Sequence, residues 1–380
     1  MVMYGTRPEA IKVAPLIAGL EASAHLTAVP VVTGQHREML DQVNRLFGIT
    51  PVRDFDLMLP GASLNDILAR SVAAAAECIR DLRPDAVVVQ GDTTTAFACS
   101  LAAFNERVPV VHVEAGLRSH DISTPFPEEA NRQLTTRLTS LHLAPTPVSK
   151  ANLVAENVAP EAIAVTGNTV IDALHSALDR PLDDSVEPGV RSLLESDDLV
   201  VLVTAHRRES WGEPMSNAMQ AVRDVAEKFP AVRWLVPMHR NPIVRETIVG
   251  ALGDVGSATL VEPLDYHTFS HAMSRAHLVL TDSGGVQEEA PSLGKPVLVM
   301  RDNTERPEAV DAGTVRLVGT DRAAVGGALV ELLDSADSYG RMARAVNPYG
   351  DGAASQRSVA AIEQFFALGE RLPDFDATSR

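Results

Sequence analysis

The chain has 380 residues, a length that favours two domains because a typical domain holds roughly 100 to 200 residues. Apolar residues make up 45% of it and charged residues 22%, which is ordinary globular usage and excludes global disorder. The 33 basic and 50 acidic residues give a net charge of −17, so the long-range field repels nucleic acid and anionic membrane surfaces. A phosphorylated ligand therefore needs a site built locally from fixed cations and backbone amides.

Cysteine content and hydropathy indicate the compartment. Cys78 and Cys99 lie in Ala-rich helical contexts and are too few for a disulfide framework or a Cys-ligated zinc site, which fits a reducing compartment. No segment approaches 18 consecutive apolar residues, and the stretch from Met1 to Arg7 lacks the regions of a signal peptide. We expect a soluble cytoplasmic protein.

Short β-branched segments alternate with longer helical patterns along the chain. The predicted strands are 2–4, 28–33, 86–90, 108–113, 199–204, 232–236, 277–280 and 296–300. This alternation is typical of βαβ units with parallel sheets, and strands that are apolar throughout indicate helices on both faces. The sequence therefore predicts an α/β fold with two doubly wound, Rossmann-like domains that face one cleft.

A shift in composition at 180–188, which reads RPLDDSVEP, marks the predicted domain linker. The N-terminal domain is expected at 1–180 and the C-terminal domain at 189–350. A last amphipathic helix at 353–368 is expected to pack back on the N-terminal domain.

The common signatures of a dinucleotide fold, a P-loop and a serine hydrolase are absent: GxGxxG, GxxxxGK[ST] and GxSxG. His267 and His271 have the spacing of zinc ligands on a helix, but they lack the glutamate of HExxH. We interpret them as histidines on a helix surface, and we predict no metal site.

The segment after the first strand combines helix capping with cations. Thr6 and Glu9 have the spacing of a capping box, and Pro8 suits the first helical turn. Capping does not explain Arg7, because the helix dipole disfavours a cation at the N-terminus unless an anion joins it. We predict that Arg7 and Lys12 bind an anion, with a well-capped helix as the alternative.

In the second domain, Ser283, Gly284 and Gly285 follow a strand and precede a helix. Glycines at this place let backbone amides approach a phosphate, although a tight turn alone is an equally good interpretation. Glu289 lies in the first turns of that helix, where a sugar or ribose hydroxyl suits a carboxylate better than a phosphate does.

Potential cations follow another strand of the second domain. After strand 199–204 and Ala205, three potential cations follow at the edge where ligands bind in open α/β sheets: His206, Arg207 and Arg208. A solvated basic turn is the alternative interpretation, but we favour an anion site. His239 takes the matching place after strand 232–236, where a structural role is the simpler interpretation.

Acidic residues gather at the corresponding edge of the first domain. Asp92 follows one strand, and capping of the next helix is its alternative role. Glu114 ends an apolar strand, where an acid faces burial unless it serves a site. Glu128 and Glu129 begin a helix and also fit as ordinary first-turn acids.

The two sets of charges suit different parts of one reaction. Cations and amides of one domain suit a diphosphate leaving group, with fixed charges acting in place of Mg²⁺. Clustered acids of the other domain raise one another's pKa, so they suit acid and base work near neutral pH at a sugar carbon.

These residues resemble the non-hydrolysing UDP-N-acetylglucosamine 2-epimerases, which share the two-domain GT-B fold. The resemblance covers nearly the whole chain, in order and with compatible spacing. The matching motifs lie at 5–12, 35–37, 91–95, 112–118, 127–132, 166–169, 206–209, 282–290, 305–308 and 347–352.

The resemblance implies interconversion of UDP-N-acetylglucosamine (UDP-GlcNAc) and UDP-N-acetylmannosamine (UDP-ManNAc). In the family, UDP is eliminated to a 2-acetamidoglucal intermediate and added back after C2 is protonated from the other face. The resemblance implies no NAD, no metal and no other cofactor. It also implies a homodimer and a role in cell envelope polysaccharide biosynthesis.

The resemblance also implies roles for individual positions. Asp92, Glu114 and Glu128 match the acid–base candidates, and His206 matches a residue at the diphosphate. The positions that match UDP-sugar contacts are Arg7, Lys12, Phe269, Ser283, Gly284, Gly285 and Glu289. Bacterial members also bind UDP-GlcNAc at a second, activating site, which the resemblance places at Gln35, His36, Arg207 and His239.

Three other functions remain open from the sequence. A hydrolysing epimerase releases ManNAc and UDP, a GT-B glycosyltransferase transfers the sugar to an acceptor, and a sensor binds the nucleotide sugar unchanged. Fold alone does not separate these functions.

Overall fold

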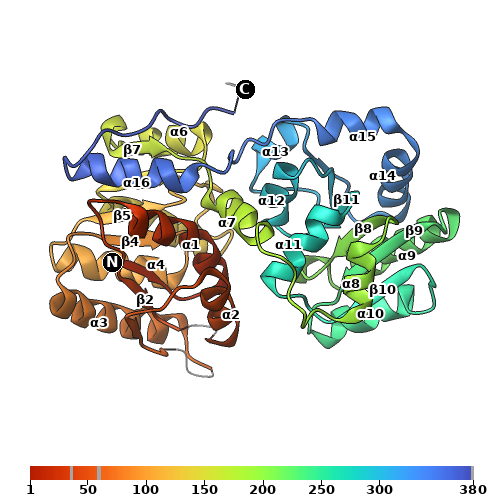
Figure 1. Ribbon diagram of the computed structural model, residues 1–380, viewed down its shortest axis with the longest axis horizontal. Coiled ribbons are helices and arrows are strands. Elements are labelled where there is room, and N and C mark those ends of the chain that lie inside the picture. The colour runs from red at the N-terminus through yellow and green to blue at the C-terminus, as the bar shows by residue number, and fades with distance from the viewer. Residues whose placement is uncertain (35–36, 58–60, 378–380) are drawn as a thin grey trace. The chain divides into compact units, whose positions relative to one another are not determined.

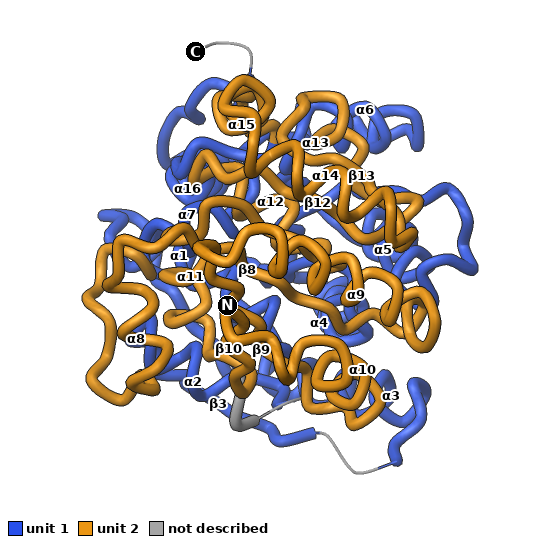
Figure 2. The backbone as a smooth tube through the Cα atoms, turned by 90° about the vertical axis from the view of Figure 1, so that its right-hand side faces the viewer, with its two compact units in different colours: residues 1–176, 349–380 blue, residues 177–348 orange. Residues whose placement is uncertain are grey.

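The computed structural model describes residues 1–34, 37–57 and 61–377. The chain forms two compact units, one of residues 1–176 and 349–380 and the other of residues 177–348 (Figures 1 and 2). Each unit contains one parallel sheet whose strands alternate with helices, which confirms the predicted α/β fold.

The first unit holds a seven-stranded parallel sheet in the order β3-β2-β1-β4-β5-β6-β7. Its strands are β1 (Val2–Tyr4), β2 (Pro30–Val32), β3 (Arg53–Asp54), β4 (Val87–Gln90), β5 (Val110–Val113), β6 (Leu141–Ala144) and β7 (Ile163–Val165). Every residue of β1, β4, β5 and β6 is buried, as their apolar sequences predict.

The helices of the first unit connect these strands. They are α1 (Arg7–Ala22), α2 (Arg37–Phe47), α3 (Leu64–Leu82), α4 (Thr94–Asn105), α5 (Glu128–Leu138), α6 (Pro147–Ala155), the 3-10 helix η1 (Pro160–Ala162), α7 (Thr169–Leu178) and α16 (Ala354–Phe365). Cys78 in α3 and Cys99 in α4 are both buried and unpaired. The last helix, α16, packs against α1.

The second unit holds a six-stranded parallel sheet in the order β10-β9-β8-β11-β12-β13. The strands are β8 (Leu199–Thr204), β9 (Val232–Pro237), β10 (Ala258–Val261), β11 (Leu278–Thr281), β12 (Val297–Val299) and β13 (Val315–Leu317). The helices are α8 (Pro188–Glu195), η2 (Arg208–Ser210), α9 (Glu213–Lys228), α10 (Pro242–Leu252), α11 (Tyr266–Arg275), α12 (Val286–Ser292), α13 (Pro307–Asp311), α14 (Arg322–Asp334) and α15 (Ala336–Ala343).

The strand order reverses once in each sheet, between β1 and β4 and between β8 and β11. Ligands of open α/β sheets bind outside the carboxyl ends of the strands at such a switch point. The turns that follow β4, β8 and β11 carry six of the site residues predicted from the sequence: Asp92, His206, Arg207, Ser283, Gly284 and Gly285.

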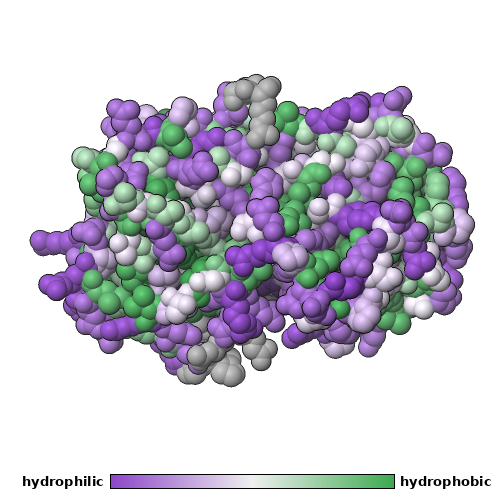
Figure 3. Space-filling model, viewed as in Figure 1, coloured by the Kyte–Doolittle hydropathy of each residue, from purple (hydrophilic) through white to green (hydrophobic). Residues whose placement is uncertain are grey.

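No helix in the described part of the chain is long and apolar enough to cross a membrane. Hydrophilic and hydrophobic residues are interspersed over the face drawn in Figure 3. The largest fully buried side chain is that of Trp234, which lies in the apolar core of the second unit.

Glycine is required at position 116, in the turn after β5 that also carries the acid Glu114. Gly116 has φ = +94°, and a Cβ added there would overlap the backbone carbonyl of Ser149. Gly48 also has a positive φ, +71°, but a Cβ added there would meet nothing within 4 Å.

We predict that Gly116→Ala destabilises the protein more than Gly48→Ala does. Left-handed backbone costs an alanine about 1–2 kcal/mol at either position, whereas the overlap with a backbone carbonyl arises only at position 116. Urea unfolding of both variants measures the difference, and equal losses of stability would contradict the packing seen here.

Candidate active site

The turn after β1 has the predicted capping box and an additional long-range bond. Thr6 Oγ1 accepts the Glu9 amide at 3.4 Å, and Glu9 Oε2 accepts the amides of Thr6 and Gly5 at 2.7 and 3.0 Å. Glu9 Oε1 accepts the hydroxyl of Thr93 at 2.6 Å. Burial raises the pKa of Glu9, and the hydrogen bonds only partly offset this effect. The buried carboxyl thus joins the turn after β1 to the turn after β4.

Glu114 at the end of β5 is buried, as its sequence context predicts, with 8% of its surface exposed and φ = +63°. Lys12 Nζ lies 2.6 Å from each of its carboxylate oxygens, and Asn168 Nδ2 donates to Oε1 at 3.0 Å. The Gln90 amide donates to Oε2. One cation and two amides therefore hold this carboxylate, and the anion that Lys12 contacts is an acid of the protein itself.

Asp92 does not cap the helix that follows it, so that alternative interpretation is wrong. Thr93 caps α4 by accepting the amide of Ala96 at 3.0 Å. Asp92 Oδ2 instead lies 2.7 Å from Nη2 and 2.9 Å from Nε of Arg132 on α5. The sequence did not single out Arg132, because its partner lies 40 residues away along the chain.

The two acids in the first turn of α5 differ in their surroundings. Glu129 is fully buried and accepts hydrogen bonds from the Ser119 amide at 3.0 Å and Gln133 Nε2 at 3.0 Å, and it pairs with Arg132 at 3.2 Å. Burial would raise the pKa of Glu129, but these contacts outweigh it and lower the pKa. Glu128 is half-buried, and its side chain makes no hydrogen bond or ion pair with any described residue. Its carboxylate is available to a ligand.

His112 within β5 holds the turn that carries Asp92. Its Nε2–H donates to the Gly91 carbonyl at 2.7 Å, and the Gly91 amide donates to the Val113 carbonyl of the same strand at 3.0 Å. Burial lowers the pKa of His112 to about 4, so the ring is neutral at neutral pH. A histidine inside an apolar strand was the sole local signal for this role.

In the second unit, Asp282 joins the turns after β8 and β11. Its Oδ2 accepts the amides of His206 and Arg207 at 2.7 and 2.8 Å, and Oδ1 lies 2.8 Å from His206 Nδ1. Burial alone would raise the pKa of Asp282, but the contacts with His206 and Arg207 outweigh it and lower the pKa. The His206 side chain remains 40% exposed, and its ring stacks on His239 with centroids 6.1 Å apart.

The glycine-containing turn after β11 packs against an arginine. A Cβ added to Gly284 would lie 2.7 Å from Arg306 Nη1, so only glycine fits this contact without movement. The Ser283 amide donates to the Thr281 hydroxyl at 2.9 Å, and Gly285 precedes α12. On α12, the carboxylate of Glu289 accepts the hydroxyl of Tyr266 at 2.9 Å.

Phe269 lies on α11, three residues after Tyr266, and is half-buried. Gln35 and His36, predicted for the second UDP-GlcNAc site, lie outside the described residues. Of the four residues predicted for that site, the structure therefore locates His239 and Arg207, and it brings both to the edge that carries His206.

Arg207 belongs to a compact group of charges. Glu305 lies 3.8 Å from Arg207, 3.0 Å from Arg301 and 3.8 Å from Arg306, while Arg306 also pairs with Glu288 at 2.5 Å. Burial would raise the pKa of Glu305, but the arginines outweigh it and lower the pKa to about 2. The cations near this edge therefore have acids of the same unit as partners.

His267 and His271 lie on one side of α11, and the Nε2 atoms of both rings approach the Arg180 carbonyl, at 3.2 and 3.0 Å. The two histidines are half-buried. Among the described residues, no group of three or more His, Cys, Asp or Glu side chains is arranged to hold a metal ion.

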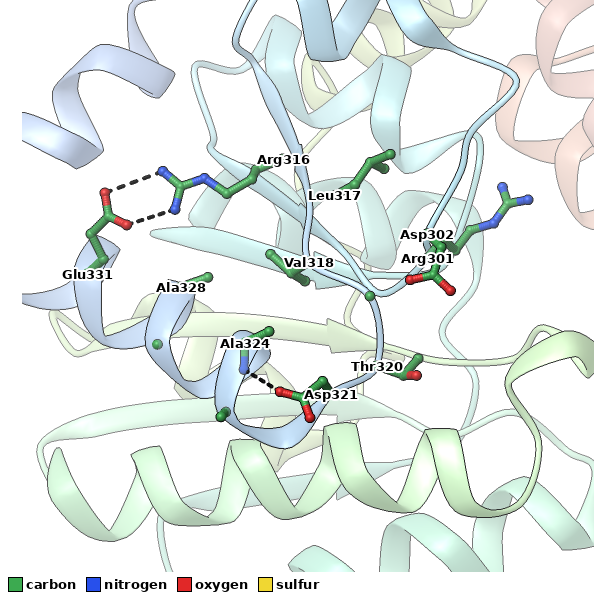
Figure 4. A pocket seen from close by; sticks show the side chains of 13 residues that line it. Arg301, Asp302, Arg316, Leu317, Val318, Thr320, Asp321, Ala324, Ala328 and Glu331 are labelled. Carbon is green, nitrogen blue, oxygen red and sulfur yellow. Dashed lines mark hydrogen bonds and ion pairs between the residues drawn. The ribbon is translucent and has the colours of Figure 1, made fainter.

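A cavity of about 690 Å³ opens on the second unit beside β13 and α14 (Figure 4). Its charged groups serve the fold: Arg316 pairs with Glu331 at 2.8 Å, and Asp321 accepts the Ala324 amide at 2.9 Å (Figure 4). None of the site residues predicted from the sequence lines it. The turns at the two switch points, rather than this cavity, are the candidate site.

These features define an α/β protein with two Rossmann-type sheets, acids at the switch point of one and a His–Asp pair at that of the other. The family model of UDP-N-acetylglucosamine 2-epimerase matches residues 18–363. The UDP-N-acetylglucosamine 2-epimerase of Salmonella typhimurium is 49% identical over 369 residues, 96% of this chain and 98% of that protein. The chain belongs to the UDP-N-acetylglucosamine 2-epimerase family.

Solved structures of the family have the same fold. The Neisseria meningitidis UDP-GlcNAc 2-epimerase bound to UDP-GlcNAc matches with a TM-score of 0.86 and 44% identity, over 96% of this chain and 99% of that one. The Methanocaldococcus jannaschii UDP-GlcNAc 2-epimerase in complex with UDP-GlcNAc and UDP matches with a TM-score of 0.78 and 30% identity, over 97% and 99%.

We predict that Lys12→Met destabilises the protein more than the double variant Lys12→Met/Glu114→Gln. Removal of one partner leaves a buried charge unpaired, which costs about 3–5 kcal/mol, whereas removal of both charges avoids that cost. Urea unfolding midpoints provide the measurement. A double variant that is no more stable than Lys12→Met would show that the ion pair is not what balances Glu114.

We predict that stability falls between pH 6.5 and pH 4 because of two buried histidines. Burial lowers the pKa of His112 to about 4 and that of His142 to about 3. Above pH 6.5 both histidines are neutral in the folded and in the unfolded chain, so their contribution to stability is fully present. Below pH 6.5 the histidines bind protons only in the unfolded chain, so the free energy of unfolding falls by about 1.4 kcal/mol per pH unit for each histidine.

The control is His142→Leu, which removes one of the two titrating groups. Urea midpoints measured at pH 7.5 and 5.5 should fall less for this variant than for the wild type. Equal falls in both proteins would mean that His142 is accessible to protons in the folded state.

Proposed function

We propose that the protein interconverts UDP-GlcNAc and UDP-ManNAc without net hydrolysis. UDP is eliminated to a 2-acetamidoglucal intermediate and is added back after C2 receives a proton on the opposite face. The observation that carries the proposal is the group of acids at the carboxyl edge of the first sheet: Asp92, Glu114 and Glu128. Inversion at C2 requires groups that remove and return a proton, and carboxylates do this work.

The surroundings of the three acids support separate tasks. Glu114 is a buried carboxylate whose charge Lys12 compensates, which suits a proton acceptor in a fixed position. Asp92 is oriented by Arg132, whereas Glu128 is bound to no described residue and can face substrate directly. Removal of the C2 proton breaks the C2–H bond, its electrons form the C1–C2 double bond, and UDP leaves with the C1–O electrons.

The departing UDP needs positive charge and hydrogen-bond donors. We assign these roles to His206 at the diphosphate and to Arg7, Ser283, Gly284 and Gly285. Glu289 is assigned to a sugar or ribose hydroxyl, and Phe269 to the uracil. Asp282 fixes the His206 ring at Nδ1, so that the other ring nitrogen is positioned to contact the charge that develops on the diphosphate. The same geometry favours the return of UDP in the reverse step.

Arg207 and His239, together with Gln35 and His36, are proposed for an activating UDP-GlcNAc site in a cytoplasmic homodimer. The stacking of His239 on His206 supports this, because a ligand at His239 lies close to the residue assigned to the diphosphate. A polysaccharide of the cell envelope is the proposed destination of the product.

We predict that UDP-GlcNAc incubated with the protein in D₂O, with EDTA and without NAD, gives UDP-ManNAc that carries deuterium at C2. Proton NMR follows the anomeric signals and the loss of the C2 proton. Free ManNAc with UDP would instead establish a hydrolysing epimerase, and an unchanged spectrum would favour a glycosyltransferase or a sensor.

We predict that Glu114→Gln and Asp92→Asn lower kcat by about 10²–10⁴-fold, the usual contribution of acid–base catalysis, while UDP binding persists. The matched control is Glu106→Gln, an acid of the same unit that pairs with Arg80 at 2.7 Å at the surface. Steady-state kinetics and calorimetric UDP titration give the two readouts. Full activity in both acid variants contradicts the assignment.

A further inference from the structure

Asn168 lies where the chain passes between its two units. The first crossing, at residues 176–177, falls inside α7, and Asn168 directly precedes that helix. The second crossing ends at Tyr349, whose carbonyl accepts the Asn168 amide at 2.6 Å. One buried residue is therefore bonded to the segment at the second crossing and begins the helix that forms the first.

The side-chain amide of Asn168 is bonded through both its oxygen and its nitrogen. Its Oδ1 accepts the Val170 amide at 3.1 Å, at the start of α7, and its Nδ2 donates to Glu114 Oε1 at 3.0 Å. Asn168 is only 3% exposed, and its backbone carbonyl accepts the Ile171 amide at 3.1 Å. The acid assigned to proton transfer is thus connected to both crossings through a single residue, by its side chain and its backbone amide.

Helix capping alone does not explain this arrangement. Asp, Ser and Thr cap helices as well as Asn does, and each supplies the acceptor that the Val170 amide needs. Only Asn also presents an NH₂ group on the same planar amide, and a carboxylate such as Glu114 needs that donor. Two side-chain torsions separate the backbone bond to Tyr349 from the bond to Glu114, so the path between them is short and stiff.

Packing at the second crossing is close. A Cβ added to Gly350 would lie 3.2 Å from Ile171 Cγ1 and 3.5 Å from the Asn168 amide nitrogen. A second tie joins the same segments, since Asp172 of α7 accepts the amides of Ala354 and Ser355 at 3.2 and 2.8 Å. A displacement of the crossing segment is therefore passed to Asn168 instead of being absorbed in a loose loop.

We propose that Asn168 is a positioning residue that fixes Glu114 relative to the two chain crossings. The path from Tyr349 through Asn168 to Glu114 lies within the first unit, so a shift of the segment at a crossing reaches the Glu114 carboxylate through one residue. The inference rests on the proposed function, because it gives Glu114 a part in turnover.

Asn168→Asp tests the contact with Glu114. The variant keeps the acceptor for α7 and replaces the NH₂ donor by an oxygen that repels the carboxylate. We expect kcat to fall ~10²-fold, the cost of a reacting group displaced by about 1 Å, with UDP affinity unchanged. In a Glu114→Gln background the same substitution should change kcat less than ~2-fold, because residues that act through one another are not additive. The proposal is overturned if Asn168→Asp keeps the wild-type kcat. It is also overturned if kcat falls in the double variant by the product of the two single-variant effects.

Gly350→Ala tests the link to the crossing without touching Glu114. We expect kcat to fall several-fold, while UDP affinity and the far-ultraviolet circular dichroism spectrum of the folded protein are retained. The control is Gly327→Ala in α14, where an added Cβ meets nothing within 4 Å and kcat should be unchanged. Unchanged kcat in Gly350→Ala as well overturns the link.

Thermal unfolding separates this inference from the proposed function. Glu114→Gln should restore part of the melting temperature lost in Asn168→Asp, because it removes the repulsion between two carboxylates, and this readout needs no turnover. If the wild type fails to epimerise UDP-GlcNAc, the proposed function fails. The contact with Glu114 then stands if the melting temperature is restored and is overturned if it is not.

Discussion

A carboxylate buried at the end of β5 is the constraint on which the first unit's site depends. An ionised acid in this position is costly unless cations and donors surround it. Lys12 lies on α1, Gln90 ends β4, and Asn168 directly precedes α7. Three separate parts of the unit therefore contact Glu114. The fold positions the acid, and the acid in turn requires that these parts stay together.

At each switch point, one buried acid connects the turns that follow two neighbouring strands. In the first sheet the buried Glu9 carboxyl connects the turn after β1 to Thr93 in the turn after β4. In the second sheet Asp282, in the turn after β11, binds the amides of His206 and Arg207 in the turn after β8. Each pair of turns is thus preorganised by one internal acid, and the neighbouring acids or histidines are left to meet a ligand.

Local signals in the sequence predicted the local structure well. Apolar segments gave the strands, and the spacing of Thr6 and Glu9 predicted the capping box. Contacts between distant residues could not be predicted from local signals. Lys12 lies 102 residues from Glu114 along the chain, so we assigned Lys12 to the anion of a ligand. Arg132, the partner of Asp92, was missed for the same reason, because an ion pair between a turn and a helix 40 residues away depends on tertiary packing that no local pattern records.

The central claim is that the C1–O bond to UDP breaks and re-forms during epimerisation. UDP-GlcNAc labelled with ¹⁸O in the bridge between C1 and the β-phosphate tests it directly, with ³¹P NMR as the readout. If UDP is released and added back, the label spreads to the non-bridging oxygens of the β-phosphate as UDP-ManNAc appears. Formation of UDP-ManNAc with the label kept entirely in the bridge would contradict the account.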